Sequence, residues 1–139
     1  PSTYGYLDFK NNIAKKNSII VDRLKKSGAI IIGKTNTAEL GIGGHTTNRL
    51  FGPTSNPYDI SKSAAGSSGG AGAAVAAGLL PFADGTDMMG SCRAPAAYAN
   101  IYGFRPTTGL IPTDRSNEKR LDNSPVLTTP GCFAKHRRI

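Results

Sequence analysis

The sequence predicts an α/β fold from three of its stretches. Asn17 and Ser18 can cap a helix that starts at Ile19, carries two lysines near its end and stops at Gly28. The apolar letters AIII follow directly and predict a short buried strand over residues 29–32. Farther along, GAGAAVAAGLL predicts a second helix, because alanine is the best helix former. A helix joined by a tight glycine turn to a buried strand is the building unit of α/β proteins.

The remaining elements follow in chain order. Residues 41–63 are rich in Gly, Asn, Thr, Ser and Pro, which predicts a loop. The stretch PFADGTD predicts a short strand with a turn, RAPAAYAN a short helix with a proline near its start, and IYGFRPT another strand. No internal repeat is evident, and 139 residues are enough for one domain with a real core.

Charge and composition narrow the classes of function. The net charge is +8, but residues 61–112 are nearly neutral and the positive charge lies toward both ends of the chain. A nucleic-acid binder usually concentrates its positive charge and offers aromatic side chains to bases, so no nucleic-acid partner is expected. The longest apolar stretches have only the length of a strand, which predicts no membrane span.

Basic residues near the N-terminus leave one alternative open. Five of them are expected on one solvated helix face: Lys15, Lys16, Arg23, Lys25 and Lys26. A non-catalytic module that binds through this charge would show salt-dependent affinity for nucleic acid. Cys92 and Cys132 match no metal or redox spacing, so free buried thiols and a reducing, cytoplasmic location are expected.

The run AAGSSGGAGAAVAAG, residues 64–78, is the densest group of small residues in the chain. A flexible linker would continue into polar sequence, whereas this run continues into an apolar helix. A phosphate-binding loop needs a lysine after its last glycine, and none follows here. A nucleophile elbow centred on Ser68 needs an apolar strand before it and leaves only His136 as its base. These three interpretations fit poorly.

A second serine turn gives the run another meaning. Ser91 lies in GTDMMGSCRAP, twenty-four residues after Ser67. The two turns, with the small-residue helix and strand between them, resemble the amidase signature, in which a GGSSGG-type turn leads to G-[ST]-D-x-G-G-S-[IV]-R-x-P-A. The flanks SGAIIIGKTNTAEL, NRLFGPTSNPYD and GFRPTTGLIP resemble the same family in the same order. The resemblance covers about residues 20–112.

This resemblance implies part of a larger α/β fold, a mixed β-sheet covered by helices. Family members are several times longer, so residues 1–139 are expected to form a single partial domain, a central fragment of that fold. Residues 113–139 are expected to be an irregular basic tail. With the rest of the fold missing, sheet edges and apolar faces are expected to lie uncovered.

The resemblance also implies a Ser-Ser-Lys triad, which hydrolyses a carboxamide C–N bond through an acyl-enzyme. Ser91 corresponds to the nucleophile, Ser67 to the serine that relays its proton, typically from a cis peptide bond, and Ser68 to a supporting residue. Backbone N–H groups of the nucleophile turn are expected around the oxyanion hole, namely those of Met88, Met89, Gly90 and Ser91.

The base of this triad is a lysine, which burial must keep neutral so that it can accept a proton. Lys34 in GKTN is not that residue, because in the family this lysine is separate from the catalytic one. The catalytic lysine is expected a few residues before Pro1, outside this chain. The 139-residue chain alone is therefore expected to be inactive.

Some residues depart from the signature or need a role of their own. Ala65 and Met89 stand where the family has glycine, and Cys92 stands where Ile or Val is usual, with a thiol that is expected to pack rather than react. Asp87 and Arg93 flank the nucleophile and are expected to support its turn as an ion pair. Three more residues have expected roles: His45 as a loop residue or part of a pocket lining, and Tyr98 and Tyr102 as core aromatics.

The sequence thus predicts an amidase that acts on a small-molecule linear amide and needs neither metal nor cofactor. An amidotransferase subunit of the same family is the alternative enzyme, and it would work with partner chains.

Overall fold

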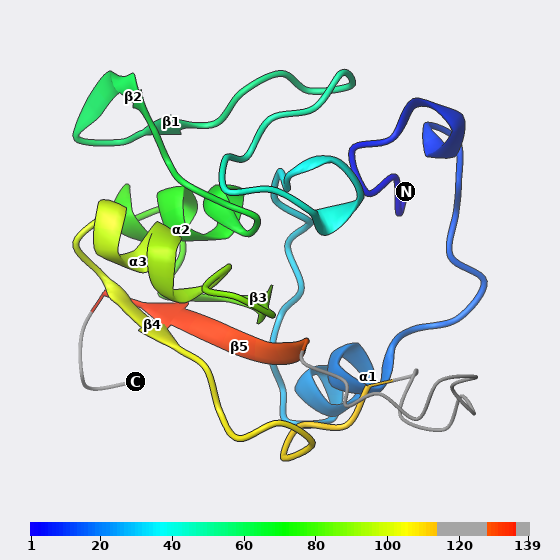
Figure 1. Cartoon of the computed structure of the whole chain (residues 1–139). Helices are drawn as coiled ribbons and strands as arrows, with labels where there is room; N and C mark the ends of the chain where they lie inside the picture. Colours follow the sequence, from blue (N-terminus) through cyan, green and yellow to red (C-terminus); the bar gives the residue numbers. More distant parts are fainter. Residues whose placement is uncertain (114–127, 136–139) are drawn as a thin grey trace.

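The centre of the structure is a small antiparallel sheet of three strands: β3 (Phe82–Asp87), β4 (Tyr102–Phe104) and β5 (Thr129–Ala134). The computed structural model describes residues 1–113 and 128–135. The last strand in the sequence, β5, lies between β3 and β4 (Figure 1). Phe133 of β5 is aligned with Ala83 on one side and with Gly103 on the other.

Two helices, α2 (Gly69–Ala76) and α3 (Arg93–Tyr98), pack on one face of this sheet (Figure 1). Phe133 points toward them and is completely buried. The other buried members of its core are small or medium-sized: Ala71, Val75, Ala83, Cys92 and Ala96. A Cβ atom on Gly85 would lie only 2.8 Å from the Phe133 ring. The Ala-rich and Gly-rich composition therefore lets helices and sheet approach closely around one aromatic ring.

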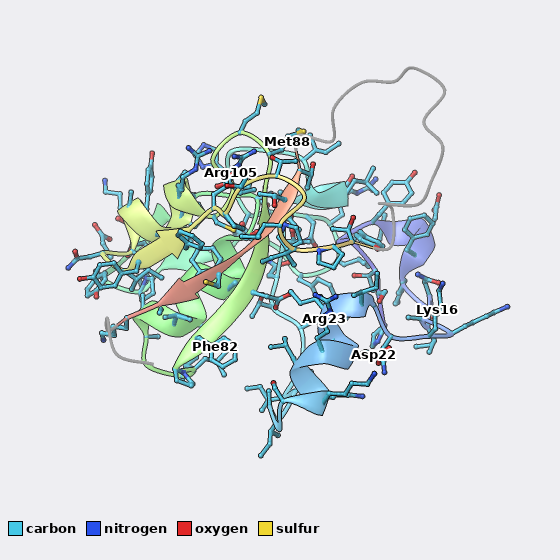
Figure 2. The ribbon with its side chains drawn as sticks, turned by 90° about the horizontal axis from the view of Figure 1, so that it is seen from below. Lys16, Asp22, Arg23, Phe82, Met88 and Arg105 are labelled. Carbon is cyan, nitrogen blue, oxygen red and sulfur yellow. The ribbon has the colours of Figure 1, made fainter. Side chains whose placement is uncertain are left out.

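The opposite face of the sheet is open. Side chains alternate between the faces of a strand. The exposed residues Phe82, Tyr102 and Phe104 thus lie on the face away from α2 and α3. Seen from below in Figure 2, Phe82 lies at one end of β3, and Met88 and Arg105 lie together at the other end. The end with Met88 is the end from which the chain enters the turn that contains Ser91.

The N-terminal part of the chain contains three short helical elements: η1 (Leu7–Phe9), α1 (Ile19–Lys26) and η2 (Glu39–Gly41). Ser18 occupies the N-cap position of α1, but its side chain makes no capping hydrogen bond. Asn17 instead donates from Nδ2 to Oδ1 of Asp22 at 2.8 Å, which ties the preceding turn to the helix. α1 lies apart from α2 and α3, on the other side of the sheet in Figure 1.

Much of the predicted element order is confirmed. The α/β class is correct, and α1, α2, β3, α3 and β4 all fall in stretches from which they were expected. The strand pairs of the described residues are antiparallel. Over the same residues, no helix has the length and apolar character that crossing a bilayer requires.

Three backbone expectations are wrong. Residues 29–32 form no strand, and Ile30 is 87% exposed, because none of the described strands pairs with this segment. Residues 41–63 are not all loop, because β1 (Ser55–Asn56) and β2 (Asp59–Ser63) pair as a hairpin. β5 likewise shows that residues 113–139 are not irregular throughout.

Three side-chain expectations also need correction. Tyr98 and Tyr102 are 57% and 52% exposed, because one ends α3 and the other lies on the open face of the sheet. Cys132 is exposed, since it alternates with the buried Phe133 along β5. The five N-terminal basic side chains are solvated as expected, but Lys15 and Lys16 precede α1 and do not share its surface.

Candidate active site

The two serine turns lie directly against each other. Ser67 and Ser68 immediately precede α2, and Ser91 lies between β3 and α3. The backbone N–H of Ser68 donates to the carbonyl oxygen of Ser91 at 3.2 Å. Oγ of Ser68 accepts from the N–H of Thr86 at 3.2 Å and lies 3.3 Å from its carbonyl oxygen. Ser68 thus joins the first turn to the strand that leads into the second.

The glycines of the first turn allow it to lie on the backbone of an earlier segment. A Cβ atom on Gly66 would lie 2.8 Å from the carbonyl oxygen of Gly43. On Gly70 it would lie 2.5 Å from the backbone nitrogen of Asn36. Real Cβ atoms essentially never come so close, so side chains are excluded at both positions. The small residues of this run are therefore needed for close approach.

Ser67 is buried, and its carbonyl oxygen is held by an earlier segment of the chain. The Gly66–Ser67 bond is cis, as the resemblance implies. The Ser67 carbonyl oxygen accepts three hydrogen bonds, from Oγ1 of Thr37 at 2.9 Å, from Oγ1 of Thr46 at 3.2 Å and from the N–H of Ala38 at 3.0 Å. All three donors come from residues 36–46, the segment on which Gly66 and Gly70 lie.

Asp87 supports the turn that contains Ser91. Its side chain is completely buried. The carboxylate accepts hydrogen bonds from Nε and Nη2 of Arg93, each at 3.0 Å, which confirms the expected ion pair. It also accepts from the backbone N–H groups of Gly90 at 2.8 Å and Cys92 at 3.1 Å. The carboxylate therefore holds both sides of Ser91 in place.

These partners also set the protonation of Asp87. Burial alone would raise the pKa of the carboxyl group. Hydrogen bonds from the Arg93 side chain and from the backbone N–H groups of Gly90, Cys92 and Arg93 outweigh burial and hold the pKa far below its usual range. Asp87 is thus negatively charged at neutral pH.

A second guanidinium group, which the sequence did not reveal, reaches the same carboxylate. Nε of Arg105 lies 3.4 Å from Oδ1 of Asp87 and donates to its carbonyl oxygen at 3.3 Å. Arg105 follows β4 and also donates from Nη2 to Oγ1 of Thr108. Its position in GFRPT is visible in the sequence, but pairing across eighteen residues requires knowledge of the sheet.

The residues next to Ser91 border open space. Gly90 has φ of +117°, which favours glycine, and nothing lies within 4 Å of where its Cβ would be. The Gly90 N–H is taken up by Asp87, whereas Met88 and Met89 expose their side chains, the latter to 84%. Ser91 itself is half-buried.

The remaining candidates lie outside this arrangement. Cys92 is completely buried, and burial, with the nearby Asp87 carboxylate, raises the pKa of its thiol to about 12, so it packs as expected. Lys34 is exposed and donates to Oγ of Ser2. His45 is exposed, with Nδ1 2.9 Å from Oγ of Ser63. His136 lies outside the described residues.

Comparison with known proteins agrees with this geometry. The model of the Amidase family matches residues 1–136. The chain is 53% identical over 112 residues to an acylamidase of Rhodococcus erythropolis. This match covers 81% of the chain and 24% of the acylamidase. It is also 50% identical over 95 residues to a subunit of the glutamyl-tRNA(Gln) amidotransferase of Saccharolobus solfataricus. That match covers 68% of this chain and 20% of the relative.

Solved structures give the same result. A bacterial aryl acylamidase of the amidase signature enzymes superposes with a TM-score of 0.79 at 38% identity, over 88% of this chain and 24% of that one. The corresponding glutamyl-tRNA(Gln) amidotransferase subunit of Thermotoga maritima superposes with a TM-score of 0.81 at 30% identity. This superposition covers 96% of this chain and 28% of the subunit. The chain spans about a quarter of the length of these proteins, and it belongs to the amidase family, the amidase signature enzymes.

Proposed function

We propose that this chain carries the nucleophile and the proton relay of an enzyme that hydrolyses small linear amides. The observation that supports this most is the hydrogen bond from the Ser68 N–H to the Ser91 carbonyl oxygen, which fixes the two serine turns against each other. The similarity to an acylamidase supports the class of reaction. The free thiols of Cys92 and Cys132 suit a reducing compartment, so we place the reaction in the cytoplasm.

In this proposal Ser91 Oγ attacks the amide carbonyl carbon, and its proton passes to Ser67 Oγ. Ser67 in turn gives its own proton to a neutral lysine, which later returns a proton through the relay to the leaving amine as the C–N bond breaks. Backbone N–H groups of the turn that ends at Ser91, above all those of Met89 and Ser91 itself, stabilise the oxyanion. Water then attacks the acyl-enzyme and releases the carboxylic acid.

The lysine of this mechanism is not Lys34, whose ammonium group binds Ser2. We take it to lie N-terminal to Pro1, as the resemblance to the amidase signature implies. We therefore expect the 139-residue chain alone to hydrolyse little or no anilide. Ready turnover of an acyl anilide by this chain, abolished by Ser91→Ala, would show that the base lies within it.

A graft tests the assignment of the two serines. The 112 residues that match the Rhodococcus erythropolis acylamidase replace the corresponding segment of that enzyme, and anilide hydrolysis is measured. We expect Ser91→Ala in the graft to lower kcat/KM at least about a thousand-fold and Ser67→Ala about a hundred-fold. Ser55→Ala, at an exposed position of β1, is the matched control and should have no effect. Full activity of the Ser91→Ala graft would rule out Ser91 as the nucleophile.

An amidotransferase role is supported by the relatives named as subunits of the glutamyl-tRNA(Gln) amidotransferase. In that role the same serines would release ammonia from a carboxamide for transfer to a second substrate held with partner chains. Glutamine hydrolysis by the graft, without anilide hydrolysis, would favour this role over that of a free-standing amidase.

A further inference from the structure

Thr46 makes two hydrogen bonds to the first serine turn, the one that contains Ser67 and Ser68, through a single hydroxyl group. Its side chain is almost completely buried, at 1% exposure. Oγ1 donates to the carbonyl oxygen of Ser67 at 3.2 Å and accepts from the backbone N–H of Gly69 at 2.8 Å. A threonine hydroxyl has one proton and two lone pairs, so it can do both at once. The two bonds reach residues on either side of Ser68.

The support of this hydroxyl is itself fixed. The N–H of Thr46 donates to the carbonyl oxygen of Ala65 at 3.0 Å, and its carbonyl oxygen accepts from Thr54 at 2.8 Å. The Thr46 side chain also abuts Gly69, where an added Cβ would lie 2.9 Å from the Cβ of Thr46. The hydroxyl therefore has little freedom to move away from the turn.

We propose that Thr46 is a positioning residue for Ser67, an inference that rests on the proposed function. Gly69 opens α2, and the first N–H groups of a helix have no partner within it. By binding the Gly69 N–H and the Ser67 carbonyl oxygen together, Thr46 sets the bend of residues 67–69. That bend directs the Ser68 N–H to Ser91, and it fixes Ser67 relative to the nucleophile.

Thr37 provides the natural comparison. Its hydroxyl donates to the same carbonyl oxygen at 2.9 Å but makes no bond to α2 among the hydrogen bonds of the described residues. Loss of the Thr37 hydroxyl should therefore disturb the Ser67 carbonyl alone. Loss of the Thr46 hydroxyl should disturb both ends of the bend.

Amide hydrogen exchange in the full chain, followed by NMR, tests the geometry without any need for activity. We expect Thr46→Val to raise the exchange rate of the Gly69 amide about ten-fold, because valine keeps the shape and removes the acceptor. Thr46→Ser should restore protection. Thr47→Val, at the exposed neighbour, and the Gly72 amide, which bonds to Ser68 within the helix, serve as controls. Unchanged protection of Gly69 in Thr46→Val would overturn the proposal.

A second arm uses the acylamidase graft, in which the host enzyme supplies the lysine of the proposed triad, and follows labelling of Ser91 by an alkyl fluorophosphonate with mass spectrometry. We expect Thr46→Val to slow labelling about ten-fold in the otherwise unchanged graft and to have no further effect in a graft that carries Ser67→Ala, since Thr46 acts through Ser67. Equal slowing in both backgrounds would reduce Thr46 to a general structural role and contradict the proposal.

The two arms fail separately. If the graft without further substitutions shows no labelling at Ser91, the proposed acyl chemistry is contradicted, and the exchange of Gly69 in the 139-residue chain still decides the role of Thr46. If Thr46→Val does not fold, Thr46→Cys replaces it, because a thiol has a similar size and is a weak donor and acceptor. Protection of Gly69 in Thr46→Cys equal to that in the wild type would then count against the proposal.

Discussion

At the scale of single residues, Asp87 holds the turn that contains Ser91 through a charge rather than through apolar contact. Its carboxylate is buried and faces two guanidinium groups, those of Arg93 and Arg105, as well as backbone N–H groups. We expect Asp87→Asn to lower the free energy of unfolding by about 2 kcal/mol. The asparagine NH2 group is a hydrogen-bond donor, and it would face guanidinium and backbone N–H groups that are donors as well. Urea denaturation measures this. Asp84→Asn on the exposed side of β3 is the control, and its change in the free energy of unfolding should be near zero.

The same carboxylate gives a pH dependence of known sign. Its pKa is depressed in the folded chain, so its contribution is complete above the unfolded pKa of about 3.9 and is lost as the pH falls toward the folded value. The stability difference between wild type and Asp87→Asn should be constant from neutral pH to about pH 5 and shrink below about pH 4. A difference that grows on acidification would contradict the assigned charge state.

The two cysteines should react very differently. Burial raises the pKa of both thiols, that of Cys92 to about 12, but Cys132 is exposed on the open face of the sheet. We expect iodoacetamide to modify Cys132 alone in the folded chain, and both thiols in urea. Peptide mapping by mass spectrometry distinguishes the sites. Early modification of Cys92 would mean that the core around Phe133 opens easily.

At the scale of elements, the glycines at the start of α2 reverse the usual effect of an alanine substitution. Within a helix, Gly→Ala normally stabilises by about 1 kcal/mol. Gly70 instead lies against the backbone of Asn36, which cannot move aside as a side chain can. We expect Gly70→Ala to lower the thermal midpoint clearly, and Gly44→Ala, where nothing lies within 4 Å, to change it little. A stabilised Gly70→Ala chain would show that the contact with Asn36 is absent in solution.

Elements whose signals are local could be predicted from the sequence. The capped run before Gly28, the Ala-rich α2 and the proline that opens α3 each carry their own signal within a few residues. The motif resemblance likewise indicated both serine turns. The strand predicted over residues 29–32 is wrong, because an apolar run forms a strand only if a neighbour pairs with it.

Contacts across the chain could not be read in the same way. Thr37, Thr46 and Arg105 each act on a partner between eighteen and thirty residues away, and nothing in their immediate surroundings marks them. β5 was missed for a related reason. Its sequence TPGCFA contains proline and glycine, and only its place between two other strands makes it a strand.

At the scale of the whole molecule, the open face of the sheet should dominate behaviour in solution. Tyr102 and Phe104 are exposed there beside Phe82, and the chain spans about a quarter of its relatives' length. We expect the purified chain to associate and to bind a hydrophobic dye. The double variant Tyr102→Thr, Phe104→Thr should reduce both in light scattering and fluorescence, and Tyr58→Thr outside this sheet should not. A monomer without dye binding would mean that this face is covered in solution.

The central place of β5 also determines when the sheet can be completed during synthesis. β3 and β4 leave the ribosome first, yet in the sheet each pairs with β5 and not with the other. Asp87 can pair only after Thr129 has been synthesised, and Thr129 is forty-two residues farther along the chain. Closing so long a loop carries an entropic cost before any strand pair repays it. Until Ala134 emerges, β3 and β4 lack the strand that joins them, so the turn that contains Ser91 gains the support of this sheet only after β5 has been made.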